Sequence, residues 1–510
     1  MALAEIHDGQ HSPQEYSHAN HLLPSLREHF RYYFGNLELS TSASEYYPGL
    51  ENSKPIIQHR AEQAATIIIE RVNTVAEILN DPEFTILTNE QKKMIGPCVL
   101  GIAKCIDGRL NAAQLFGMTA NVWETMAGII PTIPSPFDGE RILLYPQTLS
   151  QAIAARPKQD DHPELLEINI AHTECGAMDK RKTEQERKGE PFASDDLVAE
   201  NLKLFVAQSK AITNLYNLAA AEADHDMLQR VTIDAVYDTD SMGFIFGYGQ
   251  DAPLFTPRLT RDVAQPLSER LLERYQDMHY VPGMYRFNFH QTEVFLEKER
   301  VITNIIKTLL FDLDYNHGIS NQFRKRMFTD LHRIPEVTEL SANQYRALEF
   351  FIARNVALQY TTGLYEHQAG QEAHHAFADH AEAYQSITRD DGLNVTVGLY
   401  DPEVQVFGAS APKTEDAVDH ILTQSWLMNK RDLVKVPYIL FVTSALAEDA
   451  TDEDSIKQAR ANVAKIFRDI VTNEQMLAQM RAGVFVVVPA IVKNRSHEII
   501  EIPNLALSTM

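Results

Sequence analysis

Two short motifs contain residue types that bind metal ions. Cys105 is followed by Asp107 and Arg109 in the first motif, and the second motif, about seventy residues downstream, contains His172 and Cys175. Two thiolates and one neutral imidazole form a ligand set that suits Zn2+, and three protein ligands leave the fourth tetrahedral position open for water. An open position is typical of a catalytic site. The sequence therefore predicts a catalytic zinc site formed by Cys105, His172 and Cys175.

Asp107 and Arg109 are expected to lie beside this metal, held by a tight turn as a carboxylate–guanidinium pair. Zinc lowers the pKa of a bound water to roughly 7, so hydroxide is present at neutral pH. A carboxylate fixed by arginine can accept a hydrogen bond from this hydroxide and orient it. If Arg109 releases Asp107, the carboxylate can instead take the open zinc position and switch the site off. The plainer alternative is an ion pair that only stabilises the turn.

Both motifs follow short apolar runs. Residues 99–103 lead into Cys105, and residues 166–171 end directly at His172. Such runs are typical of buried strands, and ligands of open α/β sheets bind at the ends of strands. We therefore expect the three zinc ligands to meet at one edge of a sheet.

The remaining periodicity indicates an α/β fold, for which we expect a mixed sheet with flanking helices. Residues 1–90 show a helical pattern throughout. Further helices are expected at 196–221, 268–276, 293–313, 342–359 and 454–472, and further strands at 231–237, 436–442 and 484–488.

An internal similarity indicates a duplicated unit, because residues 231–247 resemble residues 395–408. The second unit contains no cysteine and cannot rebuild the zinc site. We therefore expect a helical N-terminal domain (1–90), a zinc-binding catalytic domain with a helical insertion (91–390), and a degenerate, zinc-free α/β copy (391–510).

Composition excludes several classes of protein. The chain has 510 residues and a net charge of -24, which repels nucleic acids and anionic membranes at long range. No apolar run approaches the roughly 20 residues of a spanning helix, and no signal segment begins the sequence, so no membrane insertion and a cytoplasmic location are expected. Three cysteines make a disulfide framework improbable.

The paired motifs resemble those of the β-class carbonic anhydrases, in which Cys-x-Asp-x-Arg follows one strand and His-x-x-Cys-Gly follows a later one. The resemblance extends through residues 110–117 and 176–178 and through the later strand that ends at Asp238. It implies reversible hydration of CO2 to bicarbonate and a proton by attack of zinc hydroxide. In this reading Asp107 orients the nucleophile and Arg109 fixes Asp107.

The domain layout is most similar to that of the multi-domain carboxysome shell carbonic anhydrases. That resemblance implies that the degenerate copy takes the place of the second catalytic domain with which ordinary β enzymes complete each site. A homodimer or larger homo-oligomer is expected. The compact His172–Cys175 spacing is closer to the general β pattern, and the sequence lacks a long basic leader. Enclosure in a carboxysome, or association with its shell or with Rubisco, therefore stays open.

Other readings concern individual residues and the function. Cys105 alone could be a buried structural thiol, and Cys98 is interpreted as a core residue. The histidines between 367 and 380 match no compact ligand motif and are interpreted as a helical surface. Two alternative functions are a non-catalytic scaffold stabilised by zinc and a soluble subunit of an inorganic-carbon uptake system.

Overall fold

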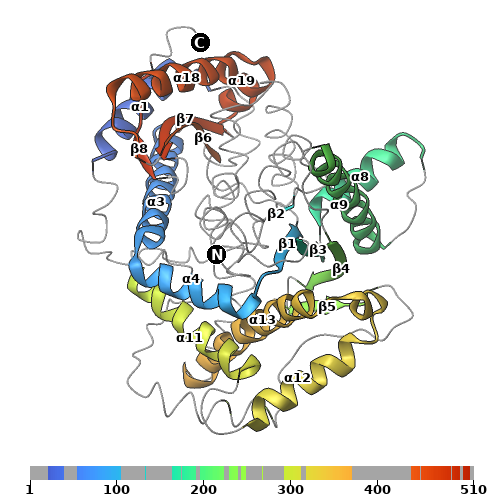
Figure 1. Cartoon of the computed structure of the whole chain (residues 1–510). Coiled ribbons are helices and arrows are strands. Elements are labelled where there is room, and N and C mark those ends of the chain that lie inside the picture. The colour runs from blue at the N-terminus through green and yellow to red at the C-terminus, as the bar shows by residue number, and fades with distance from the viewer. Residues whose placement is uncertain are drawn as a thin grey trace.

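The computed structural model of this protein is a mixed α/β structure with two sheets (Figure 1). It describes residues 21–39, 54–104, 132–133, 163–173, 175–190, 196–222, 229–238, 243–248, 263, 267, 292–311, 317–369, 438–447, 449–483, 485–493 and 498–505. Among these residues, no helix is long and apolar enough to cross a membrane.

The first sheet has five strands in the order β2-β1-β3-β4-β5. These strands are β2 (Thr132–Ile133), β1 (Val99–Lys104), β3 (Glu164–His172), β4 (Gln229–Asp238) and β5 (Gly243–Phe246). The first four pair in parallel and β5 is antiparallel to β4. Every residue of the central strand β3 is buried. Both faces of this strand are therefore covered, and its buried residues include the polar Glu167, Asn169 and His172 as well as apolar side chains.

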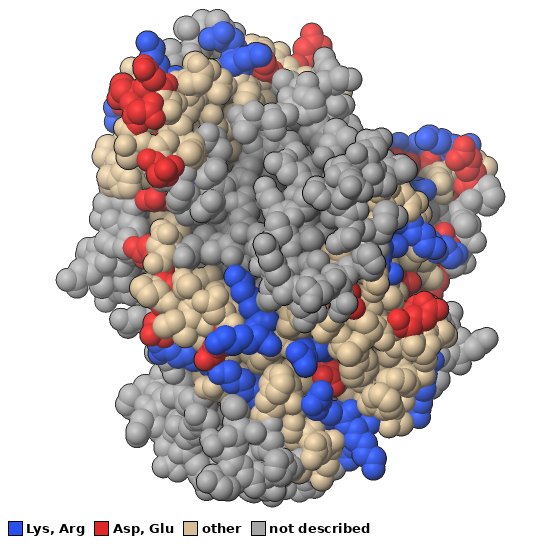
Figure 2. Space-filling model, viewed as in Figure 1, with Lys and Arg blue, Asp and Glu red and all other residues tan. Residues whose placement is uncertain are grey.

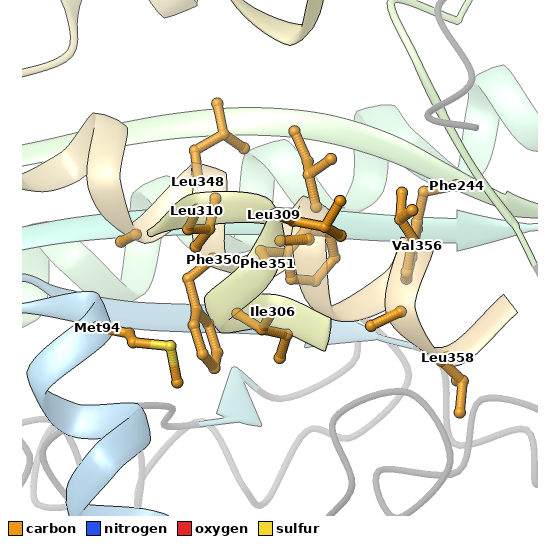
Figure 3. Packing of buried hydrophobic residues seen from close by; sticks show 14 of the residues in the cluster. Met94, Phe244, Ile306, Leu309, Leu310, Leu348, Phe350, Phe351, Val356 and Leu358 are labelled. Atoms are coloured by element: carbon orange, nitrogen blue, oxygen red, sulfur yellow. The ribbon is translucent and has the colours of Figure 1, made fainter. Parts of the chain in front are cut away.

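Helices cover both faces of this sheet. On one face, Ala171 of β3 packs with Leu202 of α9 (Leu197–Glu222), which follows α8 (Gly176–Arg187) in the connection from β3 to β4. On the other face, Ile168 and Ile170 belong to the largest core. That core also includes α4 (Pro82–Ile95), α11 (Thr292–Leu310), α12 (His317–Leu331), the 3-10 helix η4 (Pro335–Glu339) and α13 (Ala342–Ala369). Figure 3 shows the packing of Met94, Ile306 and Phe351 from three of these helices.

Gln344 joins the first turn of α13 to the amino ends of the strands. Its backbone N–H donates to the Ser341 hydroxyl at 3.1 Å, and its side-chain oxygen accepts from the Ser341 N–H at 3.0 Å, which forms a capping box. Its amide nitrogen also donates to the carbonyls of Leu165 and Gln229 at 3.1 and 3.2 Å. One side chain therefore caps the helix and fixes it to β3 and β4.

The second sheet has the order β6-β7-β8. Strands β6 (Tyr438–Leu446) and β7 (Phe485–Lys493) are parallel and are joined through α18 (Glu453–Thr472) and α19 (Glu474–Arg481), and β8 (Ile499–Glu501) is antiparallel to β7. Its core includes residues of α1 (Leu23–Asn36) and α3 (Lys54–Asn80). In Figure 1 these blue N-terminal helices lie beside the red C-terminal elements.

Helix α3 is anchored in both cores. Buried residues recur at every fourth position, which places them in one stripe along the helix: Ile57, Ala61, Ala65, Ile69 and Asn73. The first four belong to the core of the second sheet, whereas Ile78 near the end of the helix belongs to the core of the first sheet. With 27 residues, α3 spans about 40 Å and connects the two cores.

The expected secondary structure is confirmed where the structure describes it, namely for the helices within 1–90 and at 196–221, 293–313, 342–359 and 454–472, and for the strands at 99–103, 166–171, 231–237, 436–442 and 484–488. The second member of the internal similarity, 395–408, lies outside the described residues, as does most of the expected helix at 268–276. The domain boundaries at 90 and 390 stay predictions. The shared core of α1, α3 and the second sheet was not anticipated.

Candidate metal centre

The carboxyl ends of three parallel strands meet at one edge of the first sheet. Lys104, the last residue of β1, is in register with Ile170 of β3, and His172, the last residue of β3, is in register with Tyr237 of β4. The sequence continues from Lys104 directly into Cys105. The described strands therefore end side by side at this edge, β1 at Lys104 and β3 at His172.

His172 is completely buried, and a backbone carbonyl fixes one of its ring nitrogens. Its Nδ1 lies 2.8 Å from the carbonyl oxygen of Thr173. Because a carbonyl can only accept, Nδ1 carries the proton in this contact and Nε2 carries the lone pair of the neutral ring. The Thr173 N–H in turn donates to the Tyr237 carbonyl at 3.1 Å. Strand β4 thus holds the turn that orients the imidazole.

Cys175 is buried, with a relative exposure of 5%, and occupies the N-cap position of α8. Its side chain makes no capping hydrogen bond to the helix, while its carbonyl accepts from the Asp179 N–H at 3.1 Å as the first helical bond. The positive end of a helix dipole favours a negative group at this position. Cys175 thus lies at the positive end of α8, and a metal ion would bind its thiolate form.

The other proposed site residues, Cys105, Asp107 and Arg109, lie outside the described residues. Within the described part of the chain, no group of three or more His, Cys, Asp and Glu side chains is arranged to hold a metal. The expected set has only two members, His172 and Cys175, in that part. Cys98 is buried in the main core immediately before β1, at the opposite end of that strand from Cys105, in agreement with its interpretation as a core residue.

A polar network lies on the face of β3 and β4 opposite to the one that carries His172. The motifs of the sequence did not predict this network. Glu167 is fully buried, forms an ion pair with Arg230 and accepts from the Thr232 hydroxyl at 3.2 Å. Asn169 donates to Asp234 at 2.9 Å. The signal was present in the sequence, because polar residues at alternate positions of a strand share one face.

Asp234 in this network has an altered acidity. Burial is the largest cause and raises the pKa of its carboxyl group, while the hydrogen bond from Asn169 and the charges of Lys210 and Arg230 oppose the shift and Glu336 adds to it. The network lies beneath α9, whereas His172 has the same strand parity as Ile168 and Ile170 on the other face. We therefore assign the network to the packing of α9 rather than to the candidate metal centre.

The fold and the strand-end position of these residues define the chain as an α/β protein with a candidate site at the carboxyl edge of a mostly parallel sheet. No model of a known protein family matches the sequence. No curated protein matches it either.

Proposed function

We propose that this protein is a zinc-dependent carbonic anhydrase of the β class that catalyses the reversible hydration of CO2 to bicarbonate and a proton. The observation that carries the proposal is the orientation of His172: a buried imidazole at the end of the central strand, with Nδ1 bound to a backbone carbonyl, is oriented as a ligand that coordinates through Nε2. The paired sequence motifs supply the chemical class.

The residues present fit a zinc ion. His172 and Cys175 belong to one strand–turn–helix unit, and Cys105 follows the neighbouring parallel strand in the chain. We propose that these three side chains hold the metal, which leaves one tetrahedral position for solvent or substrate. When bound, zinc would lower the pKa of a water molecule to about 7 and so provide hydroxide at neutral pH.

The chain's own residues would orient the reacting groups. We assign Asp107 to accept a hydrogen bond from the attacking hydroxide and so direct its lone pair toward the carbon of CO2, and Arg109 to hold the Asp107 carboxylate in place. The Thr173 carbonyl holds the His172 ring through Nδ1, which leaves Nε2 as the nitrogen that would coordinate the metal.

The connectivity of the second sheet repeats that of the first, with β7 in the place of β4 rather than the residues 395–408 of the internal similarity. In the first sheet, β3 leads through two helices to the parallel strand β4, and β5 returns antiparallel to it. In the second sheet, β6 leads through two helices to the parallel strand β7, and β8 returns antiparallel to it. Because the second unit contains no cysteine, we propose that it is a zinc-free copy with a structural role.

The test combines zinc content with stopped-flow CO2 hydration. We expect about one zinc per chain in the wild type, loss of zinc in Cys175→Ala, and retained zinc with poor turnover in Asp107→Ala. Cys98→Ala is the matched control, because it also removes a buried thiol but lies at the other end of β1. It should retain zinc.

Each alternative outcome has a distinct meaning. Stoichiometric zinc without hydration across roughly pH 6 to 9 would favour the zinc-stabilised scaffold, because hydroxide should form within that range. Equal zinc loss in Cys98→Ala and Cys175→Ala would indicate general unfolding and remove the support for Cys175 as a ligand. Hydration only in complex with a membrane protein would favour the uptake subunit.

A further inference from the structure

Helix α12 presents an exposed aromatic pair. Phe328 is 52% exposed, and its ring centroid lies 3.6 Å from that of His332 with an interplanar angle of 36°. The His332 Nδ1 is 2.8 Å from the Phe328 carbonyl, and the Tyr345 ring of α13 lies 6.0 Å from the Phe328 ring. A single exposed apolar residue needs no explanation, but an exposed ring held by two aromatic neighbours is a rigid apolar feature of the surface.

Exposed basic residues lie on the same helices as this pair and its neighbour Tyr345. Lys325 and Arg326 are exposed on α12, and Arg324 beside them is 45% exposed and binds the buried Glu349 through two nitrogens at 3.0 and 2.7 Å. On α13, the exposed Arg346 directly follows Tyr345. The Arg346 guanidinium lies beside Gly96, the C-cap residue of α4: a side chain at position 96 would begin only 3.3 Å from it. Arg346 therefore lies against the end of α4.

The last turn of α4 extends the surface with two lysines. We call the whole surface the basic–aromatic band, and it consists of Lys92, Lys93, Arg324, Lys325, Arg326, Phe328, His332, Tyr345 and Arg346. Figure 2 shows blue side chains gathered over the lower half of the molecule, where Figure 1 places α4, α12 and α13. The band is a local excess of positive charge on a chain whose net charge is -24.

We propose that the basic–aromatic band binds an acidic polypeptide segment that carries an apolar side chain. Arginine and lysine side chains pair with carboxylates, and the exposed Phe328 ring on α12 offers an apolar contact on the same helix as three of the charges. A long polyanion such as a nucleic acid would extend beyond the band onto a surface of net negative charge and be repelled. A short acidic segment matches both the limited positive area and the aromatic pair.

The test measures binding of a fluorescein-labelled peptide, in which a Leu-Phe pair is flanked by runs of Asp and Glu, by fluorescence anisotropy on the full chain. Wild type should bind saturably and more weakly as salt increases. Lys325→Glu combined with Arg326→Glu should weaken binding by about tenfold or more, and Phe328→Ser by roughly fivefold. A peptide with Ser-Ser in place of Leu-Phe should lose its sensitivity to Phe328→Ser.

The matched control reverses two exposed charges on α18, which belongs to the core of the second sheet: Lys465→Glu combined with Arg468→Glu. It should leave binding unchanged, because it alters the net charge equally without touching the band. The proposal is overturned if wild type shows no saturable binding, or if both double variants weaken binding equally. If a single-stranded RNA oligonucleotide binds more tightly than the peptide, the surface belongs to a nucleic acid. If light scattering shows that the protein associates with itself and thereby displaces the peptide, the surface belongs to a second copy of the chain.

Discussion

Two buried histidines show how position distinguishes the roles of identical side chains. His29 of α1 and His172 of β3 are both almost fully buried, and each has one ring nitrogen 2.8 Å from a backbone carbonyl. The partner of His29 is Val487, which lies within β7 where it pairs with Leu440 of β6. His172 instead ends its strand at the edge where parallel strands meet. Burial alone therefore does not identify a candidate ligand, whereas the strand-end position does.

The protonation of His29 should make stability depend on pH. Burial lowers its pKa from 6.5 to about 4, although the Val487 carbonyl opposes the shift. Below about pH 6.5 the unfolded chain binds a proton that the folded protein does not, so stability present at neutral pH is lost as the pH falls toward 4. The shift corresponds to about 3 kcal/mol.

His29→Gln keeps a donor for the Val487 carbonyl but has no proton to gain. The free energy of unfolding, measured by urea denaturation at several values between about pH 4 and pH 7, should fall less steeply in this variant than in wild type. Identical slopes would show that His29 does not control this part of the pH dependence.

At the scale of elements, local patterns identified strands and helices but not their long-range partners. The run before Cys105 was recognisable as a strand because it is short and apolar, and the run before His172 because Leu166, Ile168 and Ile170 recur at alternate positions. The pairing of α1 with β7 could not be predicted, because periodicity shows that a face is apolar without showing what covers it. For the candidate site, the motifs predicted the ligand types, and the structure added the Thr173 contact and the N-cap position of Cys175.

Helices α11 and α13 are joined by an ion pair deep in the main core. Arg354 donates two hydrogen bonds to Glu299 at 2.7 and 2.8 Å, and both side chains are only 2–3% exposed. Arg354→Met should destabilise the protein by about 3–5 kcal/mol, because it leaves a buried carboxylate without this partner. The double variant Arg354→Met with Glu299→Leu should regain most of the lost free energy of unfolding, because it removes the unpaired buried carboxylate.

The comparison requires urea denaturation followed by circular dichroism for both variants. Lys203→Met is the control, since Lys203 pairs with Glu200 on α9 but its side chain is 70% exposed. This variant should lower the free energy of unfolding by no more than about 1 kcal/mol. A cost for Arg354→Met as small as that of the control would mean that the buried pair contributes little to joining the two helices.

At the scale of the whole molecule, α3 connects the two sheets. Its first four buried stripe residues pack in the core of the second sheet and its end packs in the core of the first. The Asn73 side chain on this helix makes the pair of backbone hydrogen bonds that a neighbouring strand would make. Its oxygen accepts from the Ile499 N–H at 2.9 Å, and its nitrogen donates to the Ile499 carbonyl at 3.3 Å. The edge of β8 is therefore closed by a helix side chain rather than by another strand.

Asn73→Ala should destabilise this contact by about 2 kcal/mol, because two backbone groups of Ile499 lose their partner in a buried environment. Hydrogen–deuterium exchange should become faster in β8, while β3 in the first sheet is unaffected. Asn36→Ala serves as the control, since the Asn36 amide is exposed and donates to the Tyr32 carbonyl of its own helix. Equal exchange in both variants would contradict a specific role for Asn73.

The distance along the chain between α1 and its partner strand has a consequence for biosynthesis. His29 and Val487 are separated by 458 residues. A ribosome adding about 5–20 residues per second needs on the order of a minute to make the intervening chain. Throughout that interval the nascent polypeptide carries the aromatic face of α1, with Phe30, Tyr33 and Phe34, before β7 exists to receive it. The second sheet can therefore be completed only long after α1 has been synthesised, and the aromatic face of this helix waits for its partner strand during that time.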